Sequence, residues 1–94
     1  MVEDVKAEAL RRVDVLPKNW RNIRWAIETA IEEGEVRYLD YMPRGRASYY
    51  KRNYDRVWKN LGDYAKEVGI ILEYQPGPRG GLWTSKWIFK GVEA

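Results

Sequence analysis

The longest periodic run of the chain lies between Tyr50 and Val68, and it limits the folds open to the chain more than any other stretch. Apolar residues recur there at alternating intervals of four and three residues, the period of one face of an α-helix. Ser48 fits the N-cap position and Gly69 the left-handed C-cap position. Gly62 lies inside the run and weakens a helix by about 1 kcal/mol. The apolar stripe consists of Tyr50, Tyr54, Val57, Leu61, Tyr64 or Ala65, and Val68.

Two interpretations of residues 48–68 stay open on the sequence. The run is one long helix, or Asp55 caps a new helix and divides it into about 48–53 and 55–68. In the second case Asn53-Tyr54-Asp55 makes a turn that keeps the phase of the stripe. Periodicity alone does not separate the two.

Two helices are expected before this run. The first covers about 3–13, and its thin apolar stripe either covers the core or meets a second copy of the chain. The second begins at Pro17, a residue suited to the first helical position, and ends at Gly34. The wide apolar stripe of the second helix consists of Trp20, Ile23, Ala26, Ile27, Ala30 and Ile31.

The second helix carries its charges in the order opposite to the one that the helix macrodipole favours. Two explanations remain open: phosphate held near its first turns, or ion pairs of Glu32 or Glu33 with Arg11 or Arg12. The charged residues in question are Lys18, Arg21 and Arg24 at the start, and Glu28, Glu32 and Glu33 at the end.

Strand patterns occupy the rest of the chain. Residues 35–41 alternate loosely and predict a short strand. Residues 70–75 and 82–90 predict a hairpin around the turn QPGPRGG, with one strongly apolar face. Because a two-stranded ribbon is marginal alone, the hairpin is expected to pack on the helices. Trp83, beside the turn, is the aromatic residue that most readily stays exposed, although packing in the hairpin is its alternative.

Composition excludes several kinds of chemistry. The 94 residues suffice for one domain with one modest core. Without Cys and His, the chain has no thiol nucleophile, disulfide, imidazole base or usual zinc ligand. It also has no nucleotide-binding motif, so we expect neither an enzyme nor a cofactor, metal or small-molecule ligand. No apolar run approaches the roughly 20 residues of a membrane span, and a cytoplasmic location fits. The excess of charged over neutral polar residues is typical of thermophile proteins.

Cations are concentrated in the middle of the chain. Residues 35–69 carry eight cations and five acids, whereas the net charge of the whole chain is +3. Arginine and lysine at helical spacing suit phosphates, arginine also suits guanine, and asparagine suits adenine. Tyr50 and Tyr54 are expected in the core, and Trp58 beside them. The candidate binding residues are Arg52, Arg56, Lys59 and Asn60 on the outward helix face, Arg44 and Arg46 in the preceding loop, and Tyr49.

The order of elements resembles the winged helix-turn-helix family over residues 17–90. The likeness rests on two junctions: EVGIILEY at 67–74, where a helix runs into a strand, and QPGPRGG at 75–81, which resembles a wing tip. It implies an α+β fold with three helical segments, a short extra strand and a C-terminal wing at 70–90. It also implies a recognition helix at 57–68 and a backbone contact from Arg79. Small regulators of this family are common in archaea and their viruses. The family has two short helices with a sharp turn before the wing, whereas the apolar stripe of this chain runs unbroken from Tyr50 to Val68.

Three functional hypotheses follow for this single domain of residues 1–94. The first is a sequence-specific double-stranded DNA binder that regulates transcription, with a homodimer through the helix at 3–13 as one form. The second is an RNA or single-strand binder that stacks bases on its tyrosines and Trp83. The third is a protein-interaction module on a winged-helix frame, whose basic face meets an acidic partner.

Overall fold

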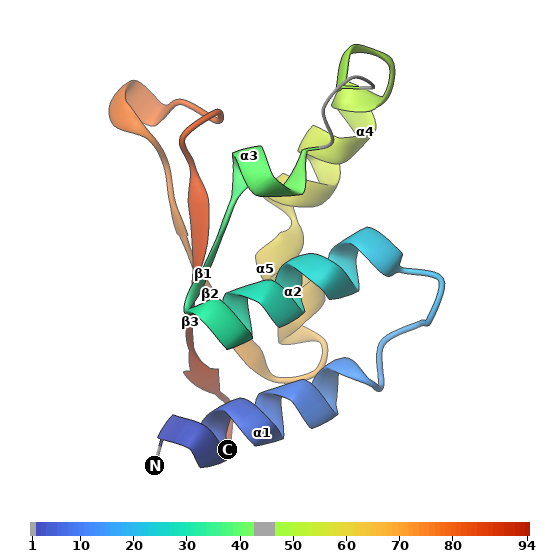
Figure 1. The fold of residues 1–94 in the computed structure, drawn as a ribbon, viewed down its shortest axis with the longest axis vertical. Coiled ribbons are helices and arrows are strands. Elements are labelled where there is room, and N and C mark those ends of the chain that lie inside the picture. Colours follow the sequence, from blue (N-terminus) through green and yellow to red (C-terminus); the bar gives the residue numbers. More distant parts are fainter. Residues whose placement is uncertain (1, 43–46) are drawn as a thin grey trace.

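The computed structural model of the chain describes the backbone of residues 2–42 and 47–94, and the side chains of residues 4–42 and 51–94. Over these residues the chain forms an α+β fold with five α-helices and three strands (Figure 1). In chain order the elements are α1 (Val2–Val13), α2 (Arg21–Glu33), β1 (Glu35–Arg37), α3 (Tyr38–Tyr41), α4 (Ala47–Lys59), α5 (Leu61–Lys66), β2 (Ile70–Gln75), the 3-10 turn η1 (Pro78–Gly80) and β3 (Lys86–Val92).

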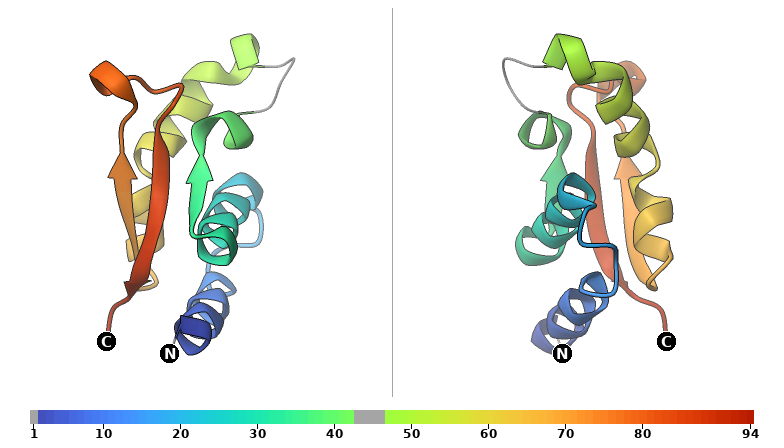
Figure 2. Two further views of the ribbon diagram at one scale, coloured as in Figure 1. Left: turned by 60° about the vertical axis from the view of Figure 1, so that its left-hand side comes forward. Right: turned by 90° about the vertical axis from the view of Figure 1, so that its right-hand side faces the viewer.

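The three strands make one antiparallel sheet in the order β1-β3-β2. Val36 of β1 and Tyr74 of β2 both lie opposite Trp87 of the central strand. Helices α2 and α5 cover one face of the sheet, as the right-hand view of Figure 2 shows. The core forms between these two layers.

The predicted hairpin does pack on the helices, and Trp58 of α4 is the centre of that contact. Its side chain is fully buried, and its indole N–H donates to Oγ of Ser85 at 3.0 Å. The indole N–H of Trp87 in turn donates to the Trp58 carbonyl at 2.9 Å. The indole N–H of each buried tryptophan therefore has a hydrogen-bond acceptor, and the two bonds connect α4 to β3 and to the loop before it.

Three predicted boundaries are wrong. The second helix begins at Arg21, because Pro17 instead opens a turn in which the Trp20 N–H donates to the Pro17 carbonyl. Residues 38–41 are helical, so the strand predicted at 35–41 ends at Arg37. The returning strand begins at Lys86, because residues 82–85 make a turn that brings Ser85 beneath Trp58.

Neither interpretation of residues 48–68 is correct. The helix continues through Asn53, Tyr54 and Asp55, and it breaks instead at Asn60, where φ is −102° and ψ is 8°. The reason lies in β3. The Trp87 indole binds the Trp58 carbonyl, which the Gly62 N–H would bind in a continuous helix.

Gly62 has a packing role at this break. A Cβ atom built on Gly62 would lie 2.7 Å from Cζ3 of Trp87. The glycine that weakens the helix is therefore the residue that lets the indole approach the α4–α5 junction.

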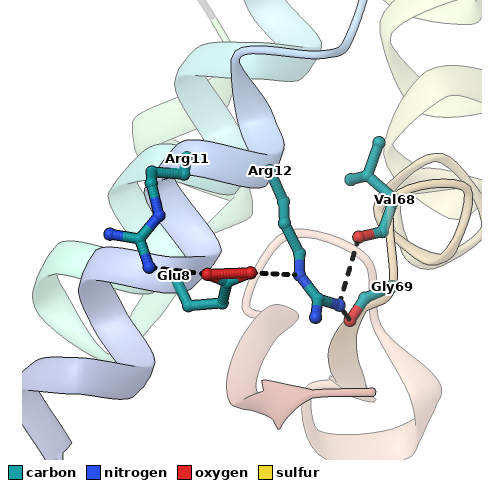
Figure 3. A network of polar contacts seen from close by, with 5 residues as sticks. All are labelled: Glu8, Arg11, Arg12, Val68 and Gly69. Atoms are coloured by element: carbon teal, nitrogen blue, oxygen red, sulfur yellow. Dashed lines mark hydrogen bonds and ion pairs between the residues drawn. The ribbon is translucent and has the colours of Figure 1, made fainter. Parts of the chain in front are cut away.

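Helix α1 covers the core, which was one of its two predicted roles. Ala9 and Val13 are fully buried. Arg12 reaches across to the turn between α5 and β2, where its guanidinium donates to the Gly69 carbonyl at 3.0 Å (Figure 3). The apolar stripe of α1 is therefore used within the chain, and a homodimer through this helix stays a prediction.

The arginines of α1 do not pair with the end of α2. Arg11 and Arg12 both bind Glu8, at 2.6 and 3.2 Å, so the predicted pairs with Glu32 or Glu33 are wrong for the described side chains. These two hydrogen bonds, from Arg11 first, lower the pKa of Glu8. None of the described helices combines the length and the apolar character that a membrane crossing requires.

Candidate nucleic-acid interface

Helix α4 presents a cationic outer face. Arg52, Arg56, Lys59 and Asn60 are all exposed, and together with Asp55 they line a shallow cleft of about 450 Å³. The opposite side of the helix faces the core, since Trp58 and Leu61 are fully buried. At about 100° per residue, Trp58 points roughly 200° away from Arg56. The structure thus brings together four of the residues that the sequence predicts for binding.

The charge of this face is not neutralised by the described part of the chain. Arg52, Arg56 and Lys59 form no ion pair with any described residue. Asp55, the nearest acid, has a side chain only 16% exposed and binds Lys51 at 2.5 Å. The three outward cations therefore remain available to an anionic ligand.

Asp55 is also held from the core side. It accepts a hydrogen bond from the Tyr38 hydroxyl. Burial, and after it this carboxylate, raise the pKa of Tyr38 above its usual value, so the hydroxyl keeps its proton and acts as the donor. The Tyr38 ring lies edge-on to Trp58 and to Trp83, with ring centroids 5.7 and 5.9 Å away. One tyrosine thus links α4 to the returning loop of the hairpin.

Asn53 of α4 and Asn60, the residue after α4, have roles that the sequence did not reveal. Oδ1 of Asn53 accepts a hydrogen bond from Nη2 of Arg56 at 2.6 Å. Nδ2 of Asn60 donates to the Arg56 carbonyl at 2.9 Å. Bidentate recognition of adenine uses the amide oxygen and one amide N–H, and the bond to the Arg56 carbonyl occupies only one of the two Nδ2 hydrogens of Asn60. The contact between Asn53 and Arg56 could have been predicted from the sequence, because residues three positions apart on a helix are neighbours.

The hairpin tip contributes one more cation at the same end of the molecule. The tip η1 and the first half of α4 both lie away from α1 and from the chain ends (Figures 1 and 2). Arg79 is exposed and has a left-handed backbone, with φ 61° and ψ 23°. Trp83 of the loop after it is 56% exposed. Arg79 is therefore an exposed cation at the same end of the molecule as the first half of α4.

Three predicted binding residues lie outside this description. Arg44 and Arg46 fall in the gap at 43–46, and Tyr49 belongs to α4 by its backbone only, with its side chain outside the described set. Among the aromatic residues predicted for the core, Trp58 is fully buried. Tyr54 is half-buried and lies edge-on to Tyr41, with ring centroids 5.5 Å apart.

The described side chains include no group of three or more acids that could hold a metal ion. Comparison with protein-family models, with curated proteins and with solved structures finds no match. The assignment of function therefore rests on the geometry and charge of the α4 face and the hairpin tip.

Proposed function

We propose that this chain is a sequence-specific double-stranded DNA-binding protein of winged-helix architecture that acts as a transcriptional regulator. The observation that carries the proposal is the outer face of α4, where Arg52, Arg56 and Lys59 are exposed and no acid among the described side chains pairs with them. An α-helix with side chains is about 10–12 Å wide, which matches the roughly 12 Å width of the major groove. Helix α4 would enter that groove, and the β2–β3 hairpin would be the wing.

The arrangement of the sheet supports the architecture. The hairpin follows the last helix directly, and β1 joins it in the order β1-β3-β2. The break at Asn60 moves the proposed reading helix from the predicted 57–68 to α4. Asp63 of α5 is an exposed acid, so it disfavours close contact of α5 with phosphates.

The salt dependence of binding tests this proposal. We expect about six cations to neutralise phosphate charge at the duplex, namely Arg52, Arg56, Lys59 and Arg79 together with Arg44 and Arg46. Each contact releases condensed counterions, so the logarithm of the binding constant should fall with the logarithm of salt concentration with a slope near −5. Fluorescence anisotropy with a labelled random duplex measures this slope.

A matched pair of variants connects the slope to α4. The triple variant Arg52→Gln, Arg56→Gln, Lys59→Gln should lower the magnitude of the slope by roughly three. Arg11→Gln removes an exposed cation at the opposite end of the molecule and should leave the slope unchanged. The absence of duplex binding at low salt, or an equal loss in both variants, would contradict the proposal.

Trp83 favours a second candidate function, the binding of single-stranded nucleic acid. Its exposed ring lies in a cleft of about 400 Å³ that Arg37 and Lys86 also line. Stacking of one base on an aromatic ring contributes about 1–3 kcal/mol. If single strands bind tighter than duplexes and Trp83→Ala removes that preference, this candidate replaces the first. A chain that binds neither would leave the protein-interaction hypothesis.

A further inference from the structure

The three cations of the α4 face differ in how they are held. The guanidinium of Arg56 donates to Oδ1 of Asn53 at 2.6 Å, and both residues are exposed. The side chains of Arg52 and Lys59 make no hydrogen bond or ion pair with any residue whose side chain is described. Their long side chains are therefore free to follow a ligand, whereas that of Arg56 already has a preferred direction.

The partner of Arg56 restrains it without cancelling its charge. Arg11, Arg12, Arg24 and Arg37 are each held by a carboxylate. The amide oxygen of Asn53 is neutral, so Arg56 keeps its full positive charge. A guanidinium has five N–H donors in a planar fork, and this contact leaves others free for a pair of acceptors.

The backbone around Arg56 is fixed as well. Its carbonyl accepts the Asn60 side chain at 2.9 Å. Two residues further on, Trp58 is fully buried and is hydrogen-bonded to Ser85 and Trp87. Recognition that depends on geometry requires side chains held on a rigid element by supporting contacts, and Arg56 alone among the three cations meets this condition.

We propose that Arg56 is the guanine-reading side chain of this interface and that Asn53 is the residue that positions it, whereas Arg52 and Lys59 contact phosphates. Guanine offers two adjacent acceptors, O6 and N7, at its major-groove edge, and they match the fork of a guanidinium. A phosphate contact tolerates a mobile side chain. The inference rests on the proposed function and specifies which residue carries its sequence preference.

The test compares two affinities for each variant. One is for the duplex that the wild-type chain selects from a random library, and the other is for the unselected random duplex. Arg56→Lys keeps the positive charge but loses the planar fork of the guanidinium. The ratio of the two affinities should therefore fall about tenfold, whereas the affinity for random duplex should stay within about twofold of the wild-type value. Asn53→Ala should lower the ratio about threefold or more in the same way, because the fork loses its preferred direction.

Two further variants separate positioning from a merely structural role. Asn53→Asp keeps an acceptor for Arg56 but cancels its charge, so it should weaken both affinities and lower the magnitude of the salt slope by about one. Arg52→Ala should weaken both affinities equally and leave the ratio unchanged. Circular dichroism checks that each variant is folded.

The outcomes are distinguishable. If the wild-type chain binds no duplex, the proposed function fails and this inference fails with it. If it binds duplexes but selects no guanine, or if Asn53→Ala leaves the ratio unchanged, only the inference is overturned. If Arg52→Ala lowers the ratio as much as Arg56→Lys does, the division of roles on α4 is wrong.

Discussion

Arg79 shows how a single residue can sacrifice local stability at a proposed binding surface. A side chain in the left-handed region costs about 1–2 kcal/mol, and glycine is the residue that adopts this conformation freely. Glycines stand at positions 77, 80 and 81 of the same turn, yet position 79, with φ 61°, is an arginine. Backbone strain of this kind is often found at functional sites, which agrees with a wing-tip contact to DNA.

Replacement of Arg79 by glycine should therefore change stability and binding in opposite directions. We expect the free energy of unfolding to rise by about 0.5–1 kcal/mol, since the strain disappears and only part of the gain is lost to backbone entropy. Duplex affinity should fall, and the magnitude of the salt slope should decrease by about one. Thermal denaturation and anisotropy measure the two effects.

Arg79→Lys is the control for this prediction. It keeps both the charge and the strained backbone, so stability and duplex affinity should stay close to those of the wild type. A loss of stability in Arg79→Gly would show that the arginine stabilises the turn.

At the scale of elements, the α4–α5 junction shows how a strand can determine where a helix breaks. The Trp87 ring lies against Gly62, and its N–H binds the carbonyl of Trp58. Helix propensity alone favours alanine over glycine by about 1 kcal/mol. The packing opposes it, because a Cβ at this position would be 2.7 Å from the indole.

Gly62→Ala should therefore destabilise the protein by about 1–3 kcal/mol, the usual cost of overpacking a core. Chemical denaturation measures the change in the free energy of unfolding. In a Trp87→Phe background the same substitution should cost less, because phenylalanine lacks the ring atoms nearest to Gly62. A stabilising effect of Gly62→Ala in the wild-type background would show that the junction relaxes and that Trp87 does not cause the break.

At the scale of the whole molecule, the proposed function assigns DNA binding to only one of its two ends. Helix α1 and the chain ends lie at one end, and α4 and the hairpin tip lie at the other (Figure 1). Glu8 connects Arg11 and Arg12 on α1, and Arg12 continues to the Gly69 carbonyl. The charges around Glu8 should therefore affect the attachment of α1 and leave DNA binding unchanged.

This separation predicts a specific pH dependence of stability. Hydrogen bonds from Arg11 and then Arg12 lower the pKa of Glu8 from its usual 4.5. A lowered carboxyl pKa stabilises the folded state above about pH 4.5, and the contribution is lost as the pH falls through the folded pKa. Glu8→Gln should therefore be less stable than the wild type at pH 7, with a difference in melting temperature that shrinks towards pH 3.

The effect should be small because these charges are exposed. Glu33→Gln is the control, since Glu33 is exposed and forms no ion pair with a described residue. Duplex affinity at pH 7 should be the same in both variants. A constant difference between Glu8→Gln and the wild type from pH 7 to pH 3 would mean that the ion pairs do not stabilise the fold.

The sequence by itself determined the features that depend on local periodicity. The phase of residues 50–68 correctly separates the buried Leu61 and Ala65 from the exposed Arg52, Arg56 and Lys59, because a helix face repeats every three to four residues. The hairpin and the general α+β class were also predictable from periodicity, because strands repeat every two residues and helices every three to four. The winged-helix architecture and the DNA-binding function stay proposals.

Only the tertiary structure decided where these periodic segments begin, bend and end. The break at Asn60 depends on Trp87, 27 positions further along the chain, and the helical turn at 38–41 places Tyr38 and Tyr41 in the core. The carboxylate of Asp55 likewise accepts a hydrogen bond from the Tyr38 hydroxyl, which comes from another element. These contacts join residues distant in sequence, so a pattern of neighbouring residues does not predict them.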